Sequence, residues 1–351
     1  MPASETSPTG QALEIDKEIA EKNGCNDEMW ISLVLMPKPA RIFLNCCRSI
    51  NTSSIETEAL EDPKENGRSY HAYREGRYLL PNDDTELQRL DIHHAMMVTA
   101  LDGELYLAPI GNAPRRVLDL CTGSGIWAME FADKFPDCEV SGNDLSPTQP
   151  KLVPPNLHFF IDDAEADWVY EDKPFDFIHA RYLSGAIRDF PRLIRQAFNC
   201  TRSGGWVQFA DWDSVLYSDD KSTEGTAFES FNRITLTAFA KAGFNMSPGP
   251  SLEQWLTETG FINIKAKKFK LPFAPWGKDR KDKRLGINNF HQIDLGIEST
   301  AMAILTRYEN WSPQDVQIMA AKSRHDARNP DIHGVFDFFR DPGENNFVLK
   351  S

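Results

Sequence analysis

The sequence is short of cysteine, of long apolar runs and of basic residues. Its 351 residues include six cysteines but no C-x-x-C pair, a pattern that favours neither a disulfide framework nor a zinc cluster. The apolar stretch at residues 30–36 is far shorter than the roughly 20 residues that span a bilayer. The N-terminus lacks the basic and apolar regions of a signal peptide. We therefore expect an intracellular protein with reduced thiols and no membrane partner.

The charge balance argues against nucleic acid as a partner. The chain has 38 Lys and Arg against 52 Asp and Glu, a formal net charge of −14. A nucleic-acid-binding protein normally carries a basic face that neutralises phosphates. Hydrophobic residues make up 41% of the chain, which is ample for a core, and no fixed-period repeat indicates a solenoid. The composition favours one enlarged globular domain.

Composition changes along the chain predict its organisation. Residues 1–66 are polar and are expected to form a poorly ordered leader. Within it, the apolar piece at residues 23–52 is interpreted either as a docking segment or as an insertion or gene-model artefact. Residues 67–110 are expected to form an N-terminal flap with a cap helix over 84–101, which begins with helix-start residues. Residues 111–351 are the main domain.

Alternating strand-like and helix-like segments follow residue 115. Short apolar runs predict strands, and the first three are followed closely by Gly, Asn or Asp. The expected strands are 117–120, 139–142, 157–161, 175–180, 206–210, 261–271 and 333–339. Helices between early strands imply right-handed crossovers and a parallel sheet covered on both faces. We therefore expect a doubly wound α/β fold with helical insertions at about 220–260 and 275–330. Such late insertions commonly cover the carboxyl edge, where ligands bind.

The block from Val117 to Ser146 carries the chemistry. A strand contains Asp119, a turn contains Gly123 and Gly125, a helix follows, and Asp144 comes just past the next strand. Glycines permit a tight turn that approaches a ligand, and an acid at the tip of the second strand accepts hydrogen bonds from ribose hydroxyls. The block predicts a nucleoside-bearing cofactor. An NAD interpretation stays open, because alanine, which this fingerprint tolerates, occupies the position three after Gly125.

The acid before the glycines is not part of the NAD fingerprint. The order D-L-C-T-G-S-G resembles motif I of class I S-adenosylmethionine-dependent methyltransferases, with Cys121 in place of the first glycine. Cysteine there is expected to crowd a turn that favours positive φ. The segments YHAYREGRYLLPND, DLSPTQPKLVPPNLHFFIDDAEADW and FDFIHARYLSGAIRDFPRLIRQAF are similar to fungal LaeA-like methyltransferases over about residues 67–340. The resemblance implies a seven-stranded Rossmann-like sheet and S-adenosylmethionine as cofactor.

The same resemblance implies the cofactor-contacting residues. They are Asp119, Gly123, Gly125, Asp144, Leu145, Asp163, Ala164, Arg181, Tyr73 and Tyr78. The acid at 144 is expected to bind ribose, and Asp163 to read adenine, with Asp162 as the alternative if the register differs by one residue. The arginine would pair with the cofactor carboxylate. The two tyrosines lie in a segment that the family places over the cofactor.

For the reaction we expect methyl transfer to a small secondary metabolite, chiefly at oxygen, in the cytoplasm. The alternative is a nuclear regulator of secondary metabolism that works in a protein complex. His179, after the fourth strand, and His291, in the cover, are candidate proton acceptors for an acceptor hydroxyl. Aromatic residues of the insertions are candidates to line an acceptor pocket: Phe228, Phe231, Trp255, Trp276, Phe290 and Trp311.

Overall fold

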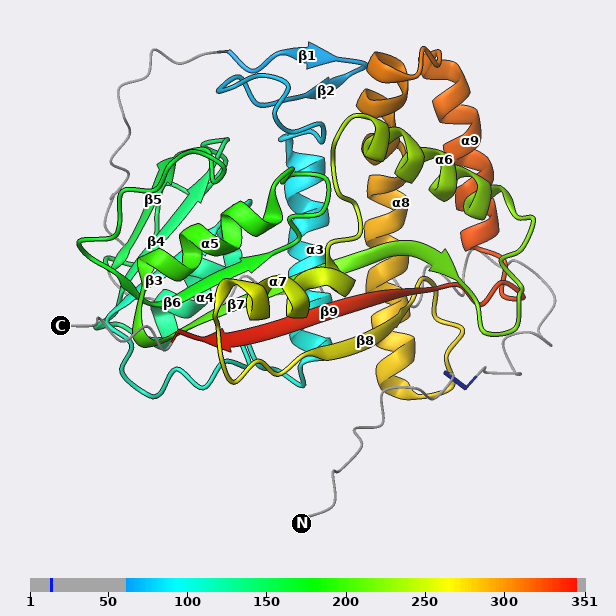
Figure 1. Cartoon of the computed structure of the whole chain (residues 1–351). Coiled ribbons are helices and arrows are strands. Elements are labelled where there is room, and N and C mark those ends of the chain that lie inside the picture. Colours follow the sequence, from blue (N-terminus) through cyan, green and yellow to red (C-terminus); the bar gives the residue numbers. More distant parts are fainter. Residues whose placement is uncertain (1–12, 15–60, 346–351) are drawn as a thin grey trace.

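The computed structural model of the chain describes residues 13–14 and 61–345 (Figure 1). The elements follow in this order: β1 (Lys64–Glu65), β2 (Arg68–Ser69), α3 (Asp84–Ala100), β3 (Arg116–Leu120), α4 (Ile126–Lys134), β4 (Glu139–Asp144), β5 (Leu157–Ile161), β6 (Phe175–Arg181), α5 (Phe190–Cys200), β7 (Thr201–Tyr217), α6 (Ala227–Lys241), the 3₁₀ helix η1 (Gly249–Ser251), α7 (Leu252–Thr259), β8 (Lys267–Pro272), α8 (Arg280–Tyr308), α9 (Pro313–Ala327) and β9 (Val335–Glu344). The expected docking segment, residues 23–52, lies outside the described residues.

Seven strands form one mixed sheet in the order β5-β4-β3-β6-β7-β9-β8. The first five are parallel, as the helical connections between them predict. The last two strands join this sheet through β9, which runs antiparallel to both β7 and β8, so β8 keeps the direction of the first five. Pro272 at the end of β8 pairs with Val335 at the start of β9. The chain between them leaves and returns at the same end of the sheet, which makes the two strands antiparallel.

Two hydrophobic clusters hold helices against opposite faces of the sheet. On one face, Trp127 and Phe131 of α4 pack with Phe177 of β6 and Val140 of β4. On the other, α5 and α7 pack on β3, β6 and β7. The late helix α7 therefore belongs to this layer and not to a cover over the carboxyl edge. The two layers give the doubly wound α/β arrangement that the alternating segments predict.

A third cluster joins the remaining helices beyond the carboxyl end of the sheet. Helices α6, α8 and α9 pack on one another, and α8 also runs along α3 (Figure 1). Their buried side chains share one core with the distal halves of β7 and β9, which extend past the other strands. The helix α3 thus stands between the sheet and this helical half. Its residues can therefore line a cavity at the sheet and another cavity in the helical half.

The flap before α3 is tied to the helix by its polar residues. The Asp83 side chain caps α3 by accepting from the Glu86 N–H at 3.1 Å. The same carboxylate pairs with Arg68 of β2 at 2.6 and 2.8 Å, while Asn82 donates to Asp62 at 2.8 Å. The flap residues between 70 and 82 are consequently held over the carboxyl ends of β4 and β5. Asn82 also reaches Ser146 just past β4, at 3.2 Å.

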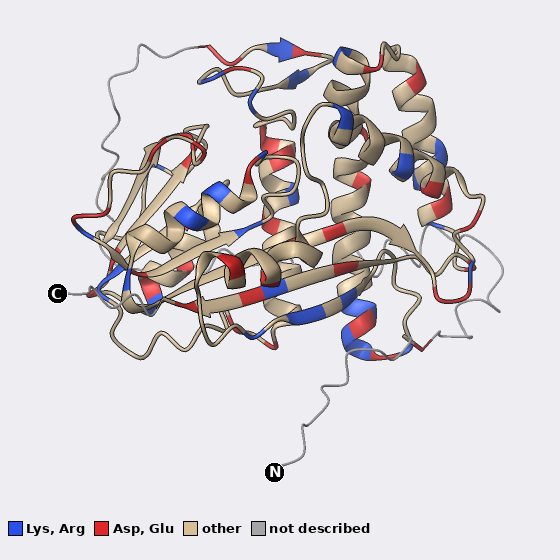
Figure 2. Cartoon of the chain, viewed as in Figure 1, with Lys and Arg blue, Asp and Glu red and all other residues tan. Residues whose placement is uncertain are grey.

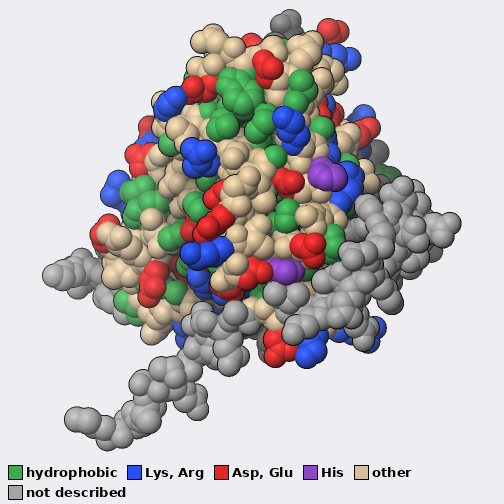
Figure 3. All heavy atoms as spheres, turned by 90° about the vertical axis from the view of Figure 1, so that its right-hand side faces the viewer, with side chains coloured by type: hydrophobic (Ala, Val, Ile, Leu, Met, Phe, Trp, Pro, Cys, Tyr) green, Lys and Arg blue, Asp and Glu red, His purple; other side chains and the backbone are tan. Residues whose placement is uncertain are grey.

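Charged side chains are spread over the whole surface. Figure 2 shows Lys and Arg interspersed with Asp and Glu along the elements rather than gathered into one basic face. On the face seen in Figure 3, hydrophobic side chains form small groups between charged ones. Within residues 13–14 and 61–345, no helix has both the length and the apolar character needed to cross a membrane.

Candidate functional site

The first cavity lies at the carboxyl ends of β3, β4, β5 and β6, under the flap. It encloses about 1130 Å³ of space between the atoms, its open mouth included. Its wall is built from the following predicted residues, among others: Asp119, Gly123, Asp144, Leu145, Asp163, Ala164, Arg181 and Tyr78. Tyr73 is outside this lining, and Gly125 lies in the turn behind it. Most of the residues predicted to bind the cofactor are therefore brought together around one space.

The turn after β3 forms although cysteine replaces a glycine. Cys121 adopts φ +51°, a left-handed conformation that costs a non-glycine residue about 1–2 kcal/mol. Asn143 stabilises the turn by accepting from the Cys121 N–H at 3.1 Å. Gly123 and Gly125 also have positive φ, at +59° and +78°. A Cβ on Gly125 would lie 2.5 Å from the ring of Phe159, so this position requires glycine for space as well as for conformation.

Asp144, at the end of β4, is the buried acid of the cavity. One carboxylate oxygen accepts from the Gly123 N–H at 2.9 Å and the other from the Ser146 N–H at 3.1 Å. Burial raises the pKa of this carboxyl against the opposing effect of these backbone N–H groups. Each oxygen keeps a lone pair for a further donor. A diol such as ribose would supply two hydroxyl donors at this place.

Asp119 and His179 form a buried pair rather than a free catalytic dyad. His179 Nδ1 lies 2.7 Å from one oxygen of Asp119, and Thr122 donates to the other at 2.5 Å. The His179 ring also stacks on Trp127, with centroids 3.7 Å apart. Burial lowers the pKa of His179 to about 4, so the ring is neutral near pH 7. His179 lines neither of the two large cavities, and its catalytic role stays a prediction without a position in them.

Both acids after β5, Asp162 and Asp163, line the first cavity. Asp163 pairs with Arg74 at 2.5 Å and with Arg77 at 3.3 Å. Burial opposes its ionisation, yet the Glu165 N–H and Arg74 hold the pKa of Asp163 below its ordinary value. Two arginines of the flap, Arg74 and Arg77, thus form ion pairs with the acid that was expected to bind adenine. Asp162 accepts the N–H of Asp163 at 2.8 Å, and burial raises its pKa.

Arg181 is the last residue of β6 and lines the first cavity. Its Nη2 lies 2.7 Å from His94 Nδ1, and His94 Nε2 lies 3.0 Å from Glu130. This network from α3 and α4 fixes the guanidinium at the cavity wall. Among the described residues, no group of three or more His, Cys, Asp or Glu is placed to hold a metal ion.

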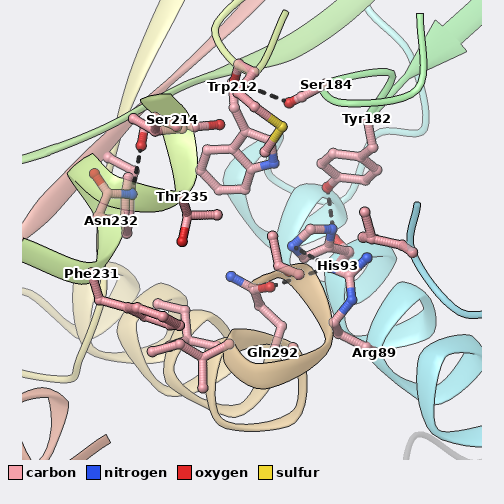
Figure 4. A pocket seen from close by; sticks show the side chains of 18 of the residues that line it. Arg89, His93, Tyr182, Ser184, Trp212, Ser214, Phe231, Asn232, Thr235 and Gln292 are labelled. Carbon is pink, nitrogen blue, oxygen red and sulfur yellow. Dashed lines mark hydrogen bonds between the residues drawn. The ribbon is translucent and has the colours of Figure 1, made fainter. Parts of the chain in front are cut away.

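A second cavity of about 1020 Å³, its mouth included, lies among α3, β7, α6, α8 and β9 (Figure 4). Its lining is mainly apolar, with Trp212, Phe228 and Phe231 among the aromatic members. Ser184, Ser214, Asn232, Thr235, Gln292 and His93 are polar members of the lining. Arg89 is its one charged residue among those described, and Glu86 neutralises it through contacts of 2.5–3.0 Å.

The two cavities adjoin. Tyr78 of the flap, Leu90 of α3 and Tyr182 after β6 line both of them. Figure 4 shows Tyr182, His93, Gln292 and Arg89 together on one side of the second cavity, with Asn232 and Ser214 on the other. A group held at the junction is therefore within reach of molecules in both spaces.

The insertion residues proposed from sequence divide into two groups. Phe228 and Phe231 line the second cavity, whereas Trp276 and Phe290 are in the hydrophobic core around it and Trp255 stacks on Phe190. Trp311 packs at the edge of that core. His291 is half-buried on α8 and lines neither large cavity, because one residue along a helix turns the side chain by about 100°. Its neighbour Gln292 is the one that faces the space.

Sequence reasoning missed His93, Gln292 and Thr235 of the second cavity. These residues come from α3, α8 and α6, so no local spacing connects them. One signal existed in α3, where Arg89 and His93 stand four residues apart and therefore lie on one face of the helix.

Comparisons with known proteins identify the family to which the chain belongs. A sequence profile described as "Methyltransferase domain" matches residues 92–266. Methyltransferase pytC of Aspergillus terreus is 39% identical over 305 residues, which cover 86% of this chain and 92% of pytC. The secondary metabolism regulator laeA of Aspergillus flavus is 33% identical over 290 residues, covering 81% and 77%.

A solved structure, phosphoethanolamine N-methyltransferase 2 of Haemonchus contortus, is similar with a TM-score of 0.40 at 17% identity. The match covers 72% of this chain and 52% of that one, so the chain spans about half that protein's length.

Proposed function

The chain belongs to the fungal LaeA-like family of S-adenosylmethionine-dependent methyltransferases, and we propose that it methylates a hydroxyl group of a small secondary metabolite. The family fixes the cofactor and the reaction class. The sequence at Ala128 was compatible with a nicotinamide cofactor, but membership of this family excludes that alternative. The single observation that supports the small-molecule acceptor is the apolar second cavity, which adjoins the cofactor cavity at Tyr78, Leu90 and Tyr182.

The residues of the first cavity fit the cofactor. In this proposal Asp144, oriented by the N–H groups of Gly123 and Ser146, holds the ribose, and Asp163 or Asp162 receives the adenine amine. Arg181, fixed by His94, receives the cofactor carboxylate. The positive-φ turn around Gly123 brings the backbone close to the ligand. When bound, S-adenosylmethionine supplies a methyl group that is activated on a positively charged sulfur.

The chain's main task is then to hold the acceptor atom in line with that methyl. Positioning of this kind can supply about 7–11 kcal/mol of the barrier. The shared wall of Leu90, Tyr78 and Tyr182 is placed to exclude water and to align the two molecules. Tyr182 is fixed because its hydroxyl donates to the carbonyl of His93 at 3.0 Å.

The chemistry of the second cavity favours an oxygen acceptor over an amine. Among its described lining residues there is no carboxylate that would hold an ammonium group. The charge of Arg89 is balanced by Glu86 at its own helix, so the space suits a neutral molecule. Ser214, Asn232 and Thr235 offer hydrogen bonds along an otherwise apolar wall, as a hydroxylated, largely hydrocarbon molecule requires.

A second candidate function is methylation of protein by a regulator, which the relatives named laeA favour. One of them, from Emericella nidulans, carries the name protein-methionine methyltransferase and is 33% identical over 80% of this chain. The experiment that separates the two supplies the purified chain with methyl-labelled S-adenosylmethionine and fungal extract divided into metabolite and protein fractions. We expect the label in the metabolite fraction, in a methyl ether. Such a product resists hydrolysis by base, whereas a methyl ester does not. Label confined to the protein fraction would contradict the proposal.

A further inference from the structure

Tyr78 lies at the junction of the two cavities. With Leu90 and Tyr182 it lines both the cofactor cavity and the second cavity, which is called the acceptor cavity from here on. Leu90 has no polar side-chain atom, and the Tyr182 hydroxyl donates its proton to the His93 carbonyl at 3.0 Å (Figure 4). Of these three residues, Tyr78 is therefore the one with a hydroxyl proton to offer a ligand where the acceptor meets the methyl.

The hydroxyl of Tyr78 is both free and accessible. Among the described residues, the side chain of Tyr78 has no hydrogen-bond partner, while its backbone N–H donates to His71 Nε2 at 3.1 Å. The Tyr70 hydroxyl also lacks a partner but is closed off from any space, whereas the Tyr78 oxygen is not among such closed-off atoms. Burial nonetheless raises the pKa of the Tyr78 phenol well above its ordinary value. The hydroxyl therefore opens onto an interior space, and it stays protonated near neutral pH.

The loop that carries Tyr78 is held at its base and near its middle. At the base, the Asn82 N–H donates to the Ser69 carbonyl at 2.8 Å, which brings the two ends of the loop together. Near the middle, Arg74 pairs with Asp163 in the wall of the cofactor cavity at 2.5 Å. The Tyr78 hydroxyl is thus placed before any ligand arrives, so less entropy is lost when it forms a hydrogen bond to one.

The described lining of the acceptor cavity contains no carboxylate and no available base. Its one charged residue, Arg89, is paired with Glu86. His93 accepts a hydrogen bond from Arg89 Nη1 on its Nε2 at 3.5 Å, and its Nδ1 is closed off from the cavity. An acceptor hydroxyl in this space must therefore ionise with the help of a donor that stabilises the anion. A phenol that stays protonated is such a donor, and hydrogen bonds to charged groups are the stronger kind.

We propose that the Tyr78 hydroxyl donates a hydrogen bond to the acceptor oxygen and stabilises its ionised form. This inference rests on the proposed function. The acceptor hydroxyl releases its proton to solvent, and Tyr78 holds the resulting oxygen anion through one lone pair while keeping its own proton. Another lone pair of that oxygen forms the bond to the methyl carbon as the carbon–sulfur bond breaks, and the electron pair of that bond remains on sulfur. The acceptor class is consequently a weakly acidic hydroxyl, a phenol or an enol, rather than an alkyl alcohol.

The first test measures the acidity of a bound probe and needs no turnover. 2-Naphthol is titrated by absorbance, which distinguishes the naphtholate ion, in the ternary complex of the full chain with S-adenosylhomocysteine. Tyr78→Phe removes one oxygen atom and keeps the ring, so the pKa of bound naphthol should rise by about 1–2 pH units through loss of a hydrogen bond to a charged oxygen. Tyr106→Phe, at a half-buried tyrosine outside both cavity linings, is the matched control and should leave that pKa unchanged. An unshifted pKa in Tyr78→Phe would overturn the proposal.

The kinetic test compares two probes of one shape, 2-naphthol and 2-naphthalenethiol. The aryl thiol ionises by itself near neutral pH, and sulfur accepts hydrogen bonds weakly, so its methylation depends little on a donor. In Tyr78→Phe at pH 7 we expect kcat for naphthol to fall about 5- to 50-fold, because each unit of pKa is a tenfold loss of the ionised form. The change for the thiol should stay below about threefold. The pH of half-maximal kcat for naphthol should rise together with the pKa of the bound probe.

Equal losses for both probes would assign Tyr78 a purely structural role. A clear rise in the Kd for S-adenosylhomocysteine in Tyr78→Phe would assign the hydroxyl to the cofactor, the role that the sequence resemblance implies. Either result overturns the proposal, and the unfolding transition of the variant shows that it has folded. A wild type that neither binds nor methylates naphthol would contradict the proposed function as well, whereas normal transfer with an unshifted pKa would contradict the role of Tyr78 alone.

Discussion

The two cavities are built in different ways. The cofactor cavity takes its wall largely from turns and strand ends between residues 119 and 187, where backbone N–H groups and carboxylates follow directly from the chain's local conformation. The acceptor cavity is assembled from side chains of α3, β7, α6, α8 and β9, spread over residues 78–336. The wall of the first cavity is therefore determined mainly by local sequence, whereas the second cavity forms only when distant helices and strands pack together. Acceptor choice can therefore change without disturbing cofactor binding.

The two spaces also differ in charge. Six acids line the cofactor cavity: Glu86, Asp119, Asp144, Asp162, Asp163 and Glu165. None of the described residues lining the acceptor cavity is an acid. In the proposed binding mode, Asp144 would accept from ribose hydroxyls and Asp163 or Asp162 from the adenine amine, and this polarity would separate the cofactor from an apolar acceptor.

Asp144→Ala gives the largest expected effect and should be confined to the cofactor cavity. Loss of two hydrogen bonds to a charged acceptor costs about 3–6 kcal/mol, or at least a hundredfold in the Kd for S-adenosylhomocysteine. Calorimetric titration measures it, with Asp137→Ala, an exposed acid before β4, as the control. Binding of 2-naphthol, followed by tryptophan fluorescence, should stay within twofold. An unchanged Kd for the cofactor product would remove Asp144 from the site.

Gly125→Ala tests the backbone construction of the first cavity. Gly111 has a similar φ of +75° but open space around it, so Gly111→Ala measures the conformational cost alone, about 1–2 kcal/mol. The Cβ at position 125 must also displace Phe159, which adds about 1–3 kcal/mol. Urea unfolding of both variants gives the difference. Equal destabilisation would show that the turn has room for a side chain.

His179→Gln tests the buried pair behind the cofactor cavity through its pH dependence. The pKa of His179 is about 4 in the folded chain and near 6.5 when unfolded, so the unfolded chain binds the extra proton between these values. Stability is therefore full above pH 6.5 and falls as pH drops toward 4, by about 2 kcal/mol from this group between pH 7 and 5. Between pH 7 and 5, the free energy of unfolding of the variant should therefore fall by about 2 kcal/mol less than that of the wild type. An identical acid loss in both proteins would contradict the assignment.

Thr235→Val is the mildest change and acts on the acceptor cavity alone. The Thr235 hydroxyl is buried and, among the described residues, has no hydrogen-bond partner. If it serves the acceptor, its loss raises the KM for 2-naphthol about fivefold, equivalent to about 1 kcal/mol. The free energy of unfolding should not fall, and cofactor affinity should not change. Thr237→Val, exposed on the same helix, is the matched control, and equal KM values in the two variants would argue against a binding role.

The sequence predicts which residues gather around the first cavity because its signals there are local. Strand ends, a glycine turn and Asp144 lie within 30 residues, and the fold brings them together as their spacing indicates. Cys121 was expected to crowd the turn, and it does adopt a strained φ, yet Asn143 holds the turn in place. What local pattern does not show is the antiparallel entry of β9, which depends on where the long connection through α8 and α9 returns.

The acceptor half escapes prediction for a physical reason. His179 precedes the end of β6 and was expected to face the methyl, but side chains alternate along a strand, and its ring turns toward α4 and Trp127. His93 showed no motif because its neighbours in the cavity wall, Gln292 and Tyr182, are distant in sequence. Helical phase decides that Gln292 faces the cavity while His291 does not.

The most direct test of the two-cavity account fills the acceptor space from one position. Thr235→Trp places an indole in the second cavity and leaves the residues of the first untouched. Transfer of labelled methyl from S-adenosylmethionine to 2-naphthol is measured beside the Kd for S-adenosylhomocysteine in the same preparation. The account predicts that transfer falls at least a hundredfold while the Kd stays within threefold. Transfer at the wild-type rate would mean that the acceptor reaches the methyl by another route, and would contradict it.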